Sequence, residues 1–122
     1  MAIRWKALGT RRPDAELERG YLAALFREER LRLGADCLFW QKPLGSVEYL
    51  PYADAERAYI REEERLTAMG CRRMKAPIAS LAFRLKSGEV KLFEVGRREM
   101  ADRALEALSK LETGLEFGFQ EE

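Results

Sequence analysis

Carboxylates are the side chains that this sequence offers in number for acid–base chemistry. The chain of 122 residues holds 21 Asp and Glu but no His. Without His there is no Ser-His or Cys-His nucleophile pair, no imidazole metal ligand and no near-neutral proton shuttle. The densest acidic cluster is Glu62, Glu63 and Glu64. Consecutive residues diverge on a helix or a strand, so this run predicts a solvated face rather than a metal site.

The two cysteines, Cys37 and Cys71, lie far apart in the sequence and have no CxxC spacing. A secreted disulfide scaffold would be much richer in Cys, and two isolated Cys cannot build a structural zinc site. We expect both thiols to be reduced, with one or both filling core space. The alternative is a reactive thiol at Cys71, because Arg72 and Arg73 beside it favour a thiolate. No phosphate-binding loop is present, and no cofactor or metal is expected.

Composition places the chain among soluble globular proteins of one domain, with 47% apolar and 35% charged residues. The net charge is +1, so no global field favours DNA, RNA or an anionic membrane. The longest apolar run, residues 21–26, is far shorter than a membrane span. The N-terminus carries positive charge without an apolar region behind it, so no secretory signal is expected. These features predict a cytoplasmic protein that is not an enzyme.

Three basic residues after Gly70 are the first candidate for binding. Arg72, Arg73 and Lys75 are expected in a loop between two strands. Such a loop can contact an anion, either a phosphate or an acidic protein surface. The alternative is ordinary solvation of a charged loop.

A basic N-terminal segment is the second candidate. It contains no acid before Asp14, and an aromatic residue within it suits contact with nucleic acid or lipid headgroups. Arg11 and Arg12 are the expected contact residues, although the sequence shows no wider basic face around them. The aromatic and basic residues are Arg4, Trp5, Lys6, Arg11 and Arg12.

Four aromatic residues form the third candidate. Aromatic side chains with polar tips anchor interfaces, but they also fill the cores of small sheets. We favour the core for this set and keep the interface as the alternative. The residues are Trp40, Tyr49, Tyr52 and Tyr59.

The N-terminal third combines a basic arm or short strand at 1–12 with a helix at 14–30. Pro13 suits the first turn of that helix, where its missing N–H costs nothing. The helix would present one apolar face, formed by Leu17, Tyr21, Ala24 and Leu25 and widened by Leu22 and Phe26.

Antiparallel strands are expected over residues 36–95. Around Cys37, apolar residues point to both faces, which predicts a buried strand, and residues 46–50 restart as a second strand. "IASLAFRL" and "VKLFEV" alternate as an antiparallel hairpin around a turn at Gly88. A helix at 97–112 follows, closed by Gly114, and then a terminal strand at 115–119.

Residues 55–66 can be read as either helix or strand. Asp54 could cap a helix, and the residues after it tolerate helical structure. However, Tyr59 and Ile60 are followed by no large apolar residue until Leu66, which is a poor helical stripe. Because tertiary context commonly overrides propensity, we predict a strand from about residue 56 to residue 63.

The order of these elements resembles that of pleckstrin-homology-like domains, closest to their bacterial members and the related GRAM domains. "EYLPYADAERAYI" resembles the place where one strand of that family ends, a Pro-containing bend follows and the next strand begins. "LRLGADCLFW" resembles their first strand, and "GRREMADRALEALSKL" resembles their closing helix. The resemblance covers roughly residues 30–112.

The resemblance implies an α+β fold, a bent antiparallel β-sandwich capped by a C-terminal helix, with the N-terminal helix as an addition. It also implies a module that binds lipids or proteins and is not an enzyme. Members that bind phosphoinositides place several basic residues around the first hairpin loop, whereas "QKPLG" offers only Lys42. Inositide recognition is therefore not expected.

Two functions from different classes follow. We favour a non-enzymatic interaction domain that binds a protein partner or self-associates, for example through an exposed apolar strand at 115–119. The alternative is a binder of anions, lipid headgroups or nucleic acid that uses the N-terminal segment and the Arg72 loop, with an affinity that salt abolishes. A carboxylate-based enzyme would need two acidic side chains facing each other in a deep pocket.

Overall fold

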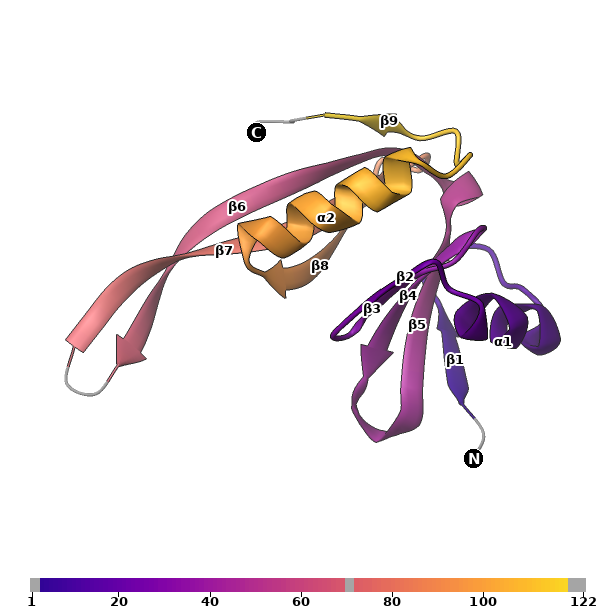
Figure 1. Ribbon diagram of the computed structural model, residues 1–122, viewed down its shortest axis with the longest axis horizontal. Coiled ribbons are helices and arrows are strands. Elements are labelled where there is room, and N and C mark those ends of the chain that lie inside the picture. The colour runs from indigo at the N-terminus through magenta and orange to yellow at the C-terminus, as the bar shows by residue number, and fades with distance from the viewer. Residues whose placement is uncertain (1–2, 70–71, 119–122) are drawn as a thin grey trace.

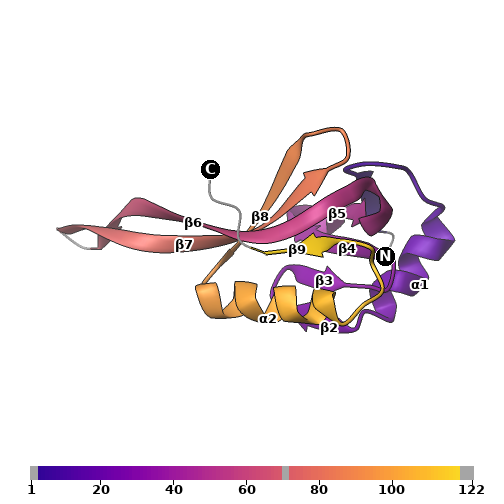
Figure 2. The same ribbon diagram turned by 90° about the horizontal axis from the view of Figure 1, so that it is seen from above.

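The described part of the chain has an α+β fold with two β-sheets and two helices. The computed structural model describes residues 3–69 and 72–118, and for 67–69 and 72–74 it describes the backbone alone. The first sheet has the strand order β1-β5-β4-β3-β2, and the second has the order β8-β7-β6-β9 (Figure 1). Helix α2 lies along the second sheet, and α1 lies beside the first (Figures 1 and 2).

The elements have the following bounds. The first sheet consists of β1 (Arg4–Ala7), β2 (Phe26–Glu28), β3 (Leu31–Leu33), β4 (Cys37–Lys42) and β5 (Ser46–Pro51). The second sheet consists of β6 (Ala55–Met69), β7 (Arg72–Leu85), β8 (Val90–Gly96) and β9 (Glu116–Phe117). The helices are α1 (Asp14–Leu22) and α2 (Arg98–Ser109), and two 3-10 turns are η1 (Pro43–Gly45) and η2 (Tyr52–Asp54).

The stretch that propensity leaves open between helix and strand is a strand, as predicted. β6 begins at Ala55, directly after η2, and runs well beyond the predicted end at residue 63. Ala58 and Ile60 face the core, where their cross-strand partners are Phe83 and Leu81. These buried cross-strand pairs stabilise the strand, whereas a helix here would have buried only a narrow stripe.

The main core lies between the two sheets and beneath α2. Phe83 is fully buried there, and its ring meets that of Phe93 edge-on with centroids 5.9 Å apart. The predicted hairpin of β7 and β8 supplies both rings, so the hairpin prediction is confirmed. The residues of α2 that enter this core are Met100, Ala101, Ala104 and Leu108.

A second core covers the other face of the first sheet. Alternating residues of β4 point to opposite sides, so Leu38 enters the main core while Phe39 enters this one. Trp5 of β1 and Tyr21 of α1 pack on Phe39, with ring centroids 5.9 and 5.4 Å from it. The first sheet is thus buried on both faces, as the apolar pattern around Cys37 predicts.

The predicted helix at 14–30 is wrong beyond Leu22. Residues 26–33 form the hairpin of β2 and β3, which turns at Glu29 with a positive φ of 50°. The physical reason is long-range pairing: β3 pairs with β4 on one side and with β2 on the other. Phe26 therefore packs on the main core as part of a strand. The apolar face expected for the longer helix therefore forms only in part: Leu17 and Tyr21 are buried, whereas Leu22 and Leu25 are exposed.

The sheets are mixed, which corrects the prediction of an antiparallel sandwich. β1 pairs with β5 in parallel, and β9 pairs with β6 in parallel. The terminal strand predicted at 115–119 is therefore paired within the chain at Glu116–Phe117, and residue 119 lies outside the described residues. Helix α2 ends at Ser109, earlier than predicted, and Gly114 takes its positive φ of 78° in the link to β9.

Candidate functional site

The basic residues expected in a loop after Gly70 belong to a strand. β7 begins at Arg72, so the backbones of Arg72, Arg73 and Lys75 pair with β6. The prediction of a loop is wrong because β6 and β7 continue to pair beyond the residues that show an alternating apolar pattern. The Lys75 side chain is exposed, while those of Arg72 and Arg73 lie outside the described residues.

The predicted N-terminal contact residues lie at the other end of the molecule. Arg11 is exposed between β1 and α1. Arg12 is half-buried, donates its backbone N–H to the Tyr49 hydroxyl at 3.1 Å and pairs with Glu16 at 3.4 Å. Figures 1 and 2 place α1 at one end of the molecule and the start of β7 at the other, so the two predicted basic groups do not form one surface.

The N-terminal segment is an ordered part of the fold. The Thr10 backbone N–H and hydroxyl donate to the two carboxylate oxygens of Asp54, at 2.7 and 2.8 Å. The Arg4 guanidinium donates to the Leu44 carbonyl at 2.8 Å, and Trp5 packs in the second core. Of the two readings of this segment, the short strand is confirmed for Arg4–Ala7, which form β1.

The most prominent feature of the surface is a projecting arm, formed by residues 61–69 of β6 and 72–78 of β7. Figures 1 and 2 show this two-stranded ribbon leaving the body of the molecule. All side chains from Arg61 to Leu66 are exposed, and Leu66 is 64% exposed. At ~3.3 Å per residue, the part of β6 in the arm corresponds to about 30 Å of strand.

Charged side chains line the base of the arm. Arg98 of α2 pairs with Glu62 at 2.9 Å, and Arg65 pairs with Glu94 of β8 at 2.6 Å. Glu63 lies 3.7 Å from Arg61. The run from Glu62 to Glu64 is exposed, which confirms the predicted solvated face.

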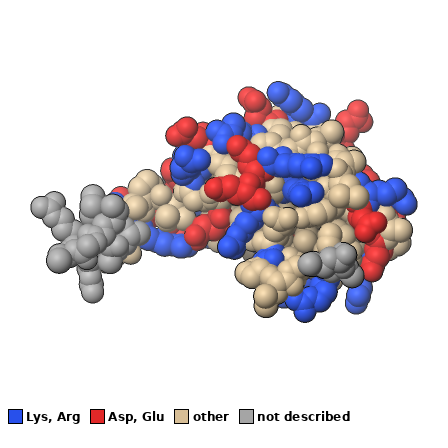
Figure 3. Space-filling view, turned by 60° about the horizontal axis from the view of Figure 1, so that its bottom comes forward, with Lys and Arg blue, Asp and Glu red and all other residues tan. Residues whose placement is uncertain are grey.

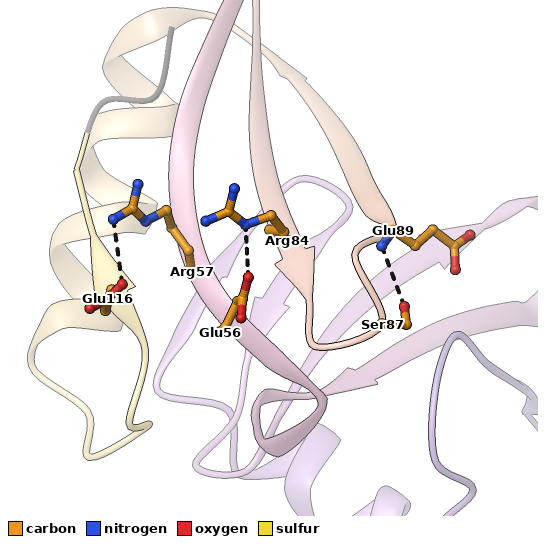
Figure 4. Close-up of polar contacts among 6 residues, drawn as sticks. All are labelled: Glu56, Arg57, Arg84, Ser87, Glu89 and Glu116. Atoms are coloured by element: carbon orange, nitrogen blue, oxygen red, sulfur yellow. Dashed lines mark hydrogen bonds and ion pairs between the residues drawn. The ribbon is translucent and has the colours of Figure 1, made fainter. Parts of the chain in front are cut away.

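The outer face of the second sheet carries two arginines from neighbouring strands. Arg57 and Arg84 are cross-strand partners, and Arg84 pairs with Glu56 at 2.9 Å while Arg57 pairs with Glu116 at 3.4 Å (Figure 4). Each guanidinium therefore faces a carboxylate of the same chain. This arrangement offsets the positive charge that an anion site would need.

A cleft of about 680 Å³ separates the two sheets at the end where β8 meets α2. Its apolar wall includes the half-buried Trp40, whose ring centroid lies 5.6 Å from that of Phe93. On the face drawn in Figure 3, Lys and Arg are interspersed with Asp and Glu, without a field of one sign. The residues that line the cleft are Glu29, Arg30, Trp40, Leu92, Glu94, Val95 and Met100.

The aromatic set divides between the core and this cleft. Tyr49, Tyr52 and Tyr59 are each 2% exposed, which confirms the core interpretation for them. The Tyr52 hydroxyl donates to the Gly34 carbonyl at 2.8 Å, so its polar tip is satisfied inside the protein. Trp40 alone of the four lines the cleft, and its place on the cleft wall could not be deduced from its sequence neighbours.

Cys37 is a free, buried thiol in the second core, as predicted for at least one cysteine. Burial raises its pKa from 9.0 to about 11, with a smaller opposing contribution from Arg12. A thiol held neutral in this way is a poor nucleophile. The alternative of a reactive Cys71 falls on a residue outside those described.

We expect the free energy of unfolding to fall as the pH rises from about 9 to about 11. The unfolded chain loses the Cys37 proton first, because the folded state raises that pKa. The stability contributed by the neutral thiol is therefore complete below about pH 9 and is lost as pH rises through about 11. The loss is on the order of 2–3 kcal/mol. Burial also raises the pKa of Tyr52, which acts in the same direction from about pH 10 upward.

Urea unfolding at about pH 8 and about pH 10.5 measures this loss. The variant Cys37→Ala should show a smaller loss between the two pH values than the parent chain. Val47→Ala, a truncation in the same core, should lower stability equally at both. An undiminished loss in Cys37→Ala would contradict the assignment to this thiol.

The described residues contain no group of three or more His, Cys, Asp or Glu that could hold a metal ion. Among the same residues, neither helix has the length and apolar character needed to cross a membrane. Glu29 and Glu94, the carboxylates of the cleft, are both exposed, and Glu94 is paired with Arg65. They lack the burial that sets apart the general acid of a carboxylate enzyme.

Comparisons with known proteins give no match. No protein-family model, curated protein or solved structure matches this chain. The resemblance to pleckstrin-homology-like domains therefore stays a prediction, and the function is inferred from the surfaces described above.

Proposed function

We propose that this chain is a non-enzymatic interaction domain that binds a protein partner or a second copy of itself through the projecting arm. The observation that carries the proposal is the exposure of every side chain from Arg61 to Leu66 on a regular strand. The arm extends the sheet past the last described residues of these strands that belong to a buried core, Ile60 on β6 and Ala79 on β7.

The energetics of a ribbon support this proposal. Ordering the backbone of one residue costs about 1–2 kcal/mol, and an isolated two-stranded hairpin is at best marginally stable in water. The described residues of the arm add no member to either buried core. A partner that covers the arm would supply the burial that the chain itself does not.

We further propose that the fold is pleckstrin-homology-like. Three features support this assignment: antiparallel pairing from β2 to β5, an antiparallel second sheet from β6 to β8, and one helix after the last long strand. α1 and the parallel strands β1 and β9 would be additions to that arrangement. An interaction role agrees with such a fold, and the absence of His from the sequence agrees with a non-enzymatic role.

Shortening the arm tests the proposed function. Glu63 and Ile78 are cross-strand partners, so residues 64–77 can be replaced by Asn-Gly, a dipeptide suited to a two-residue hairpin turn. The full chain should either exceed its 14.1 kDa monomer mass as concentration rises or retain a stoichiometric protein from lysate of the native host. The shortened chain should lose that association. Light scattering after size exclusion and a pull-down at about 0.3 M salt measure the two cases.

Two exposed leucines provide a matched control. Leu66 lies on the arm and is 64% exposed, whereas Leu44 lies in η1 and is 89% exposed. Leu66→Asn should weaken association, and Leu44→Asn should leave it unchanged, since Asn tolerates the positive φ of 66° at position 44. Association that survives both Leu66→Asn and arm shortening would overturn the proposal. Recovery of only nucleic acid or anionic lipid, removed by salt, would favour the alternative function.

A further inference from the structure

Within the described residues, the second sheet ends in an edge at β8, which pairs there with β7 alone. A strand at a sheet edge presents a row of backbone N–H and C=O groups to its surroundings. β8 has seven residues, whereas the other terminal strands β1, β2 and β9 have four, three and two. Among the terminal strands of the described part of the chain, β8 therefore offers the longest edge for pairing.

The edges of the projecting arm are longer but protected. Five consecutive charged residues, 61–65, lie on the open side of β6, and charge is a common device against pairing of an edge. On β7 the arm contains Lys75 and Pro77, and proline has no N–H to donate to an added strand. The arm is therefore unsuited to adding a strand, although its side chains from Arg61 to Leu66 are exposed and can contact a partner.

β8 carries little of this protection. It has no proline, and Val90 and Leu92 are exposed. Its two charged residues are already engaged: Lys91 pairs with Glu89 at 2.9 Å and Glu94 pairs with Arg65 at 2.6 Å. The composition of β8 thus allows another strand to pair with it.

The cleft between the sheets lies along this edge. It is lined by Leu92, Glu94 and Val95 of β8, and none of its described lining residues belongs to β7. Trp40 and Met100 add apolar wall across from β8. Its volume of about 680 Å³ is within the range of roughly 300–1,000 Å³ that is typical of ligand sites.

We propose that β8 binds an extended peptide segment of a protein partner as an additional antiparallel strand, with apolar side chains of the segment against the half-buried Trp40. Backbone groups along an edge strand are complementary to another strand and to little else. The cleft carries charges of both signs, two carboxylates and one guanidinium, so it suits a peptide of mixed or no charge rather than a polyanion. This inference rests on the proposed interaction function but assigns a different surface from the arm.

A synthetic peptide tests the proposal directly. The probe is a fluorescently labelled copy of residues 78–85, IASLAFRL, because this sequence contains the residues that pair with β8 within the fold. We expect it to bind the full chain, as measured by fluorescence anisotropy, with less than about a twofold change in affinity between ~50 and ~300 mM salt. A control peptide with proline at the position of Ala82 should bind at least about tenfold more weakly, because it lacks a central backbone donor.

Two protein variants locate the site. Leu92 is 42% exposed, so Leu92→Lys introduces an edge charge without emptying a core. It should weaken peptide binding at least about tenfold, a factor that corresponds to about 1.4 kcal/mol. Leu44→Lys, on the exposed η1 turn, should leave binding unchanged.

Amide hydrogen exchange gives a second readout that needs no variant. Bound peptide should protect amides of residues 90–96, and protection confined to the arm would overturn the proposal. So would an absence of binding at ~1 mM peptide, or equal binding by Leu92→Lys. Protection of β8 that rises with protein concentration alone would assign the edge to a second copy and would also overturn it.

The two proposals fail separately. The chain with the shortened arm keeps β8 and the cleft, so it should bind the peptide as the full chain does. If it does so but still associates like the full chain, the proposed role of the arm is wrong and the β8 site stands. If arm shortening abolishes association while the peptide binds neither chain, the β8 site is wrong and the proposed function stands.

Discussion

Replacing Phe83 with alanine is expected to lower the free energy of unfolding by about 3–5 kcal/mol. Phe83 is fully buried between the sheets, where its ring packs on Phe93 and its cross-strand partner is Ala58. Truncation leaves a cavity that the surrounding strands can close only in part, because β7 is held by neighbours on both sides. A loss of this size is a large fraction of the ~5–15 kcal/mol by which typical domains are stable.

Urea denaturation followed by circular dichroism and by tryptophan fluorescence measures the change. Leu25→Ala is the matched control, because Leu25 is 69% exposed and its loss should change stability by less than about 0.5 kcal/mol. Similar losses for Phe83→Ala and Leu25→Ala would contradict the position of Phe83 at the centre of the main core.

Phe39→Ala is expected to have an effect of similar size, about 3–5 kcal/mol, from the opposite face of the first sheet. Phe39 is 1% exposed and contacts the rings of Trp5 and Tyr21, so its removal loosens both β1 and α1. Its neighbour Leu38 belongs to the main core. Because one strand supplies both cores, we expect them to unfold together rather than in two steps.

The two tryptophans report on the two cores. Trp5 lies in the second core, and Trp40 lies beside Phe93 at the edge of the main core. In chains that keep only one tryptophan, through Trp40→Phe or Trp5→Phe, Phe39→Ala should shift the unfolding midpoint of both reporters equally. A shift confined to the Trp5 signal would show that α1 and β1 form a separate, weaker unit.

Local patterns in the sequence were sufficient to predict the strands and the helix that form most of the interior of the fold. Period-two alternation in β4, β5, β7 and β8, and the helical spacing of α2, each depend on residues that lie next to one another in the chain. The same reasoning predicted that at least one cysteine fills core space, as Cys37 does, and favoured the core for the buried tyrosines. It also identified β6 as a strand, since its apolar residues are too few for a helical face.

Long-range pairing decided what those patterns missed. "FREERLRL" contains no Gly, Pro or Asn, so nothing local marks the turn at Glu29, and only pairing with β4 draws residues 26–33 into the sheet. The parallel pairings of β1 and β9 likewise depend on partners about 40 and 60 residues away along the chain.

The candidate surfaces follow the same division. The sequence determined their chemistry: a charged run at 61–65, a domain without His, and aromatic residues with polar tips. Tertiary structure decided their location. The arm forms where β6 and β7 continue to pair beyond the core. The cleft forms where β8 approaches Trp40. Burial and edge exposure are properties of how strands are assembled, so residue types and spacing along one strand cannot reveal them.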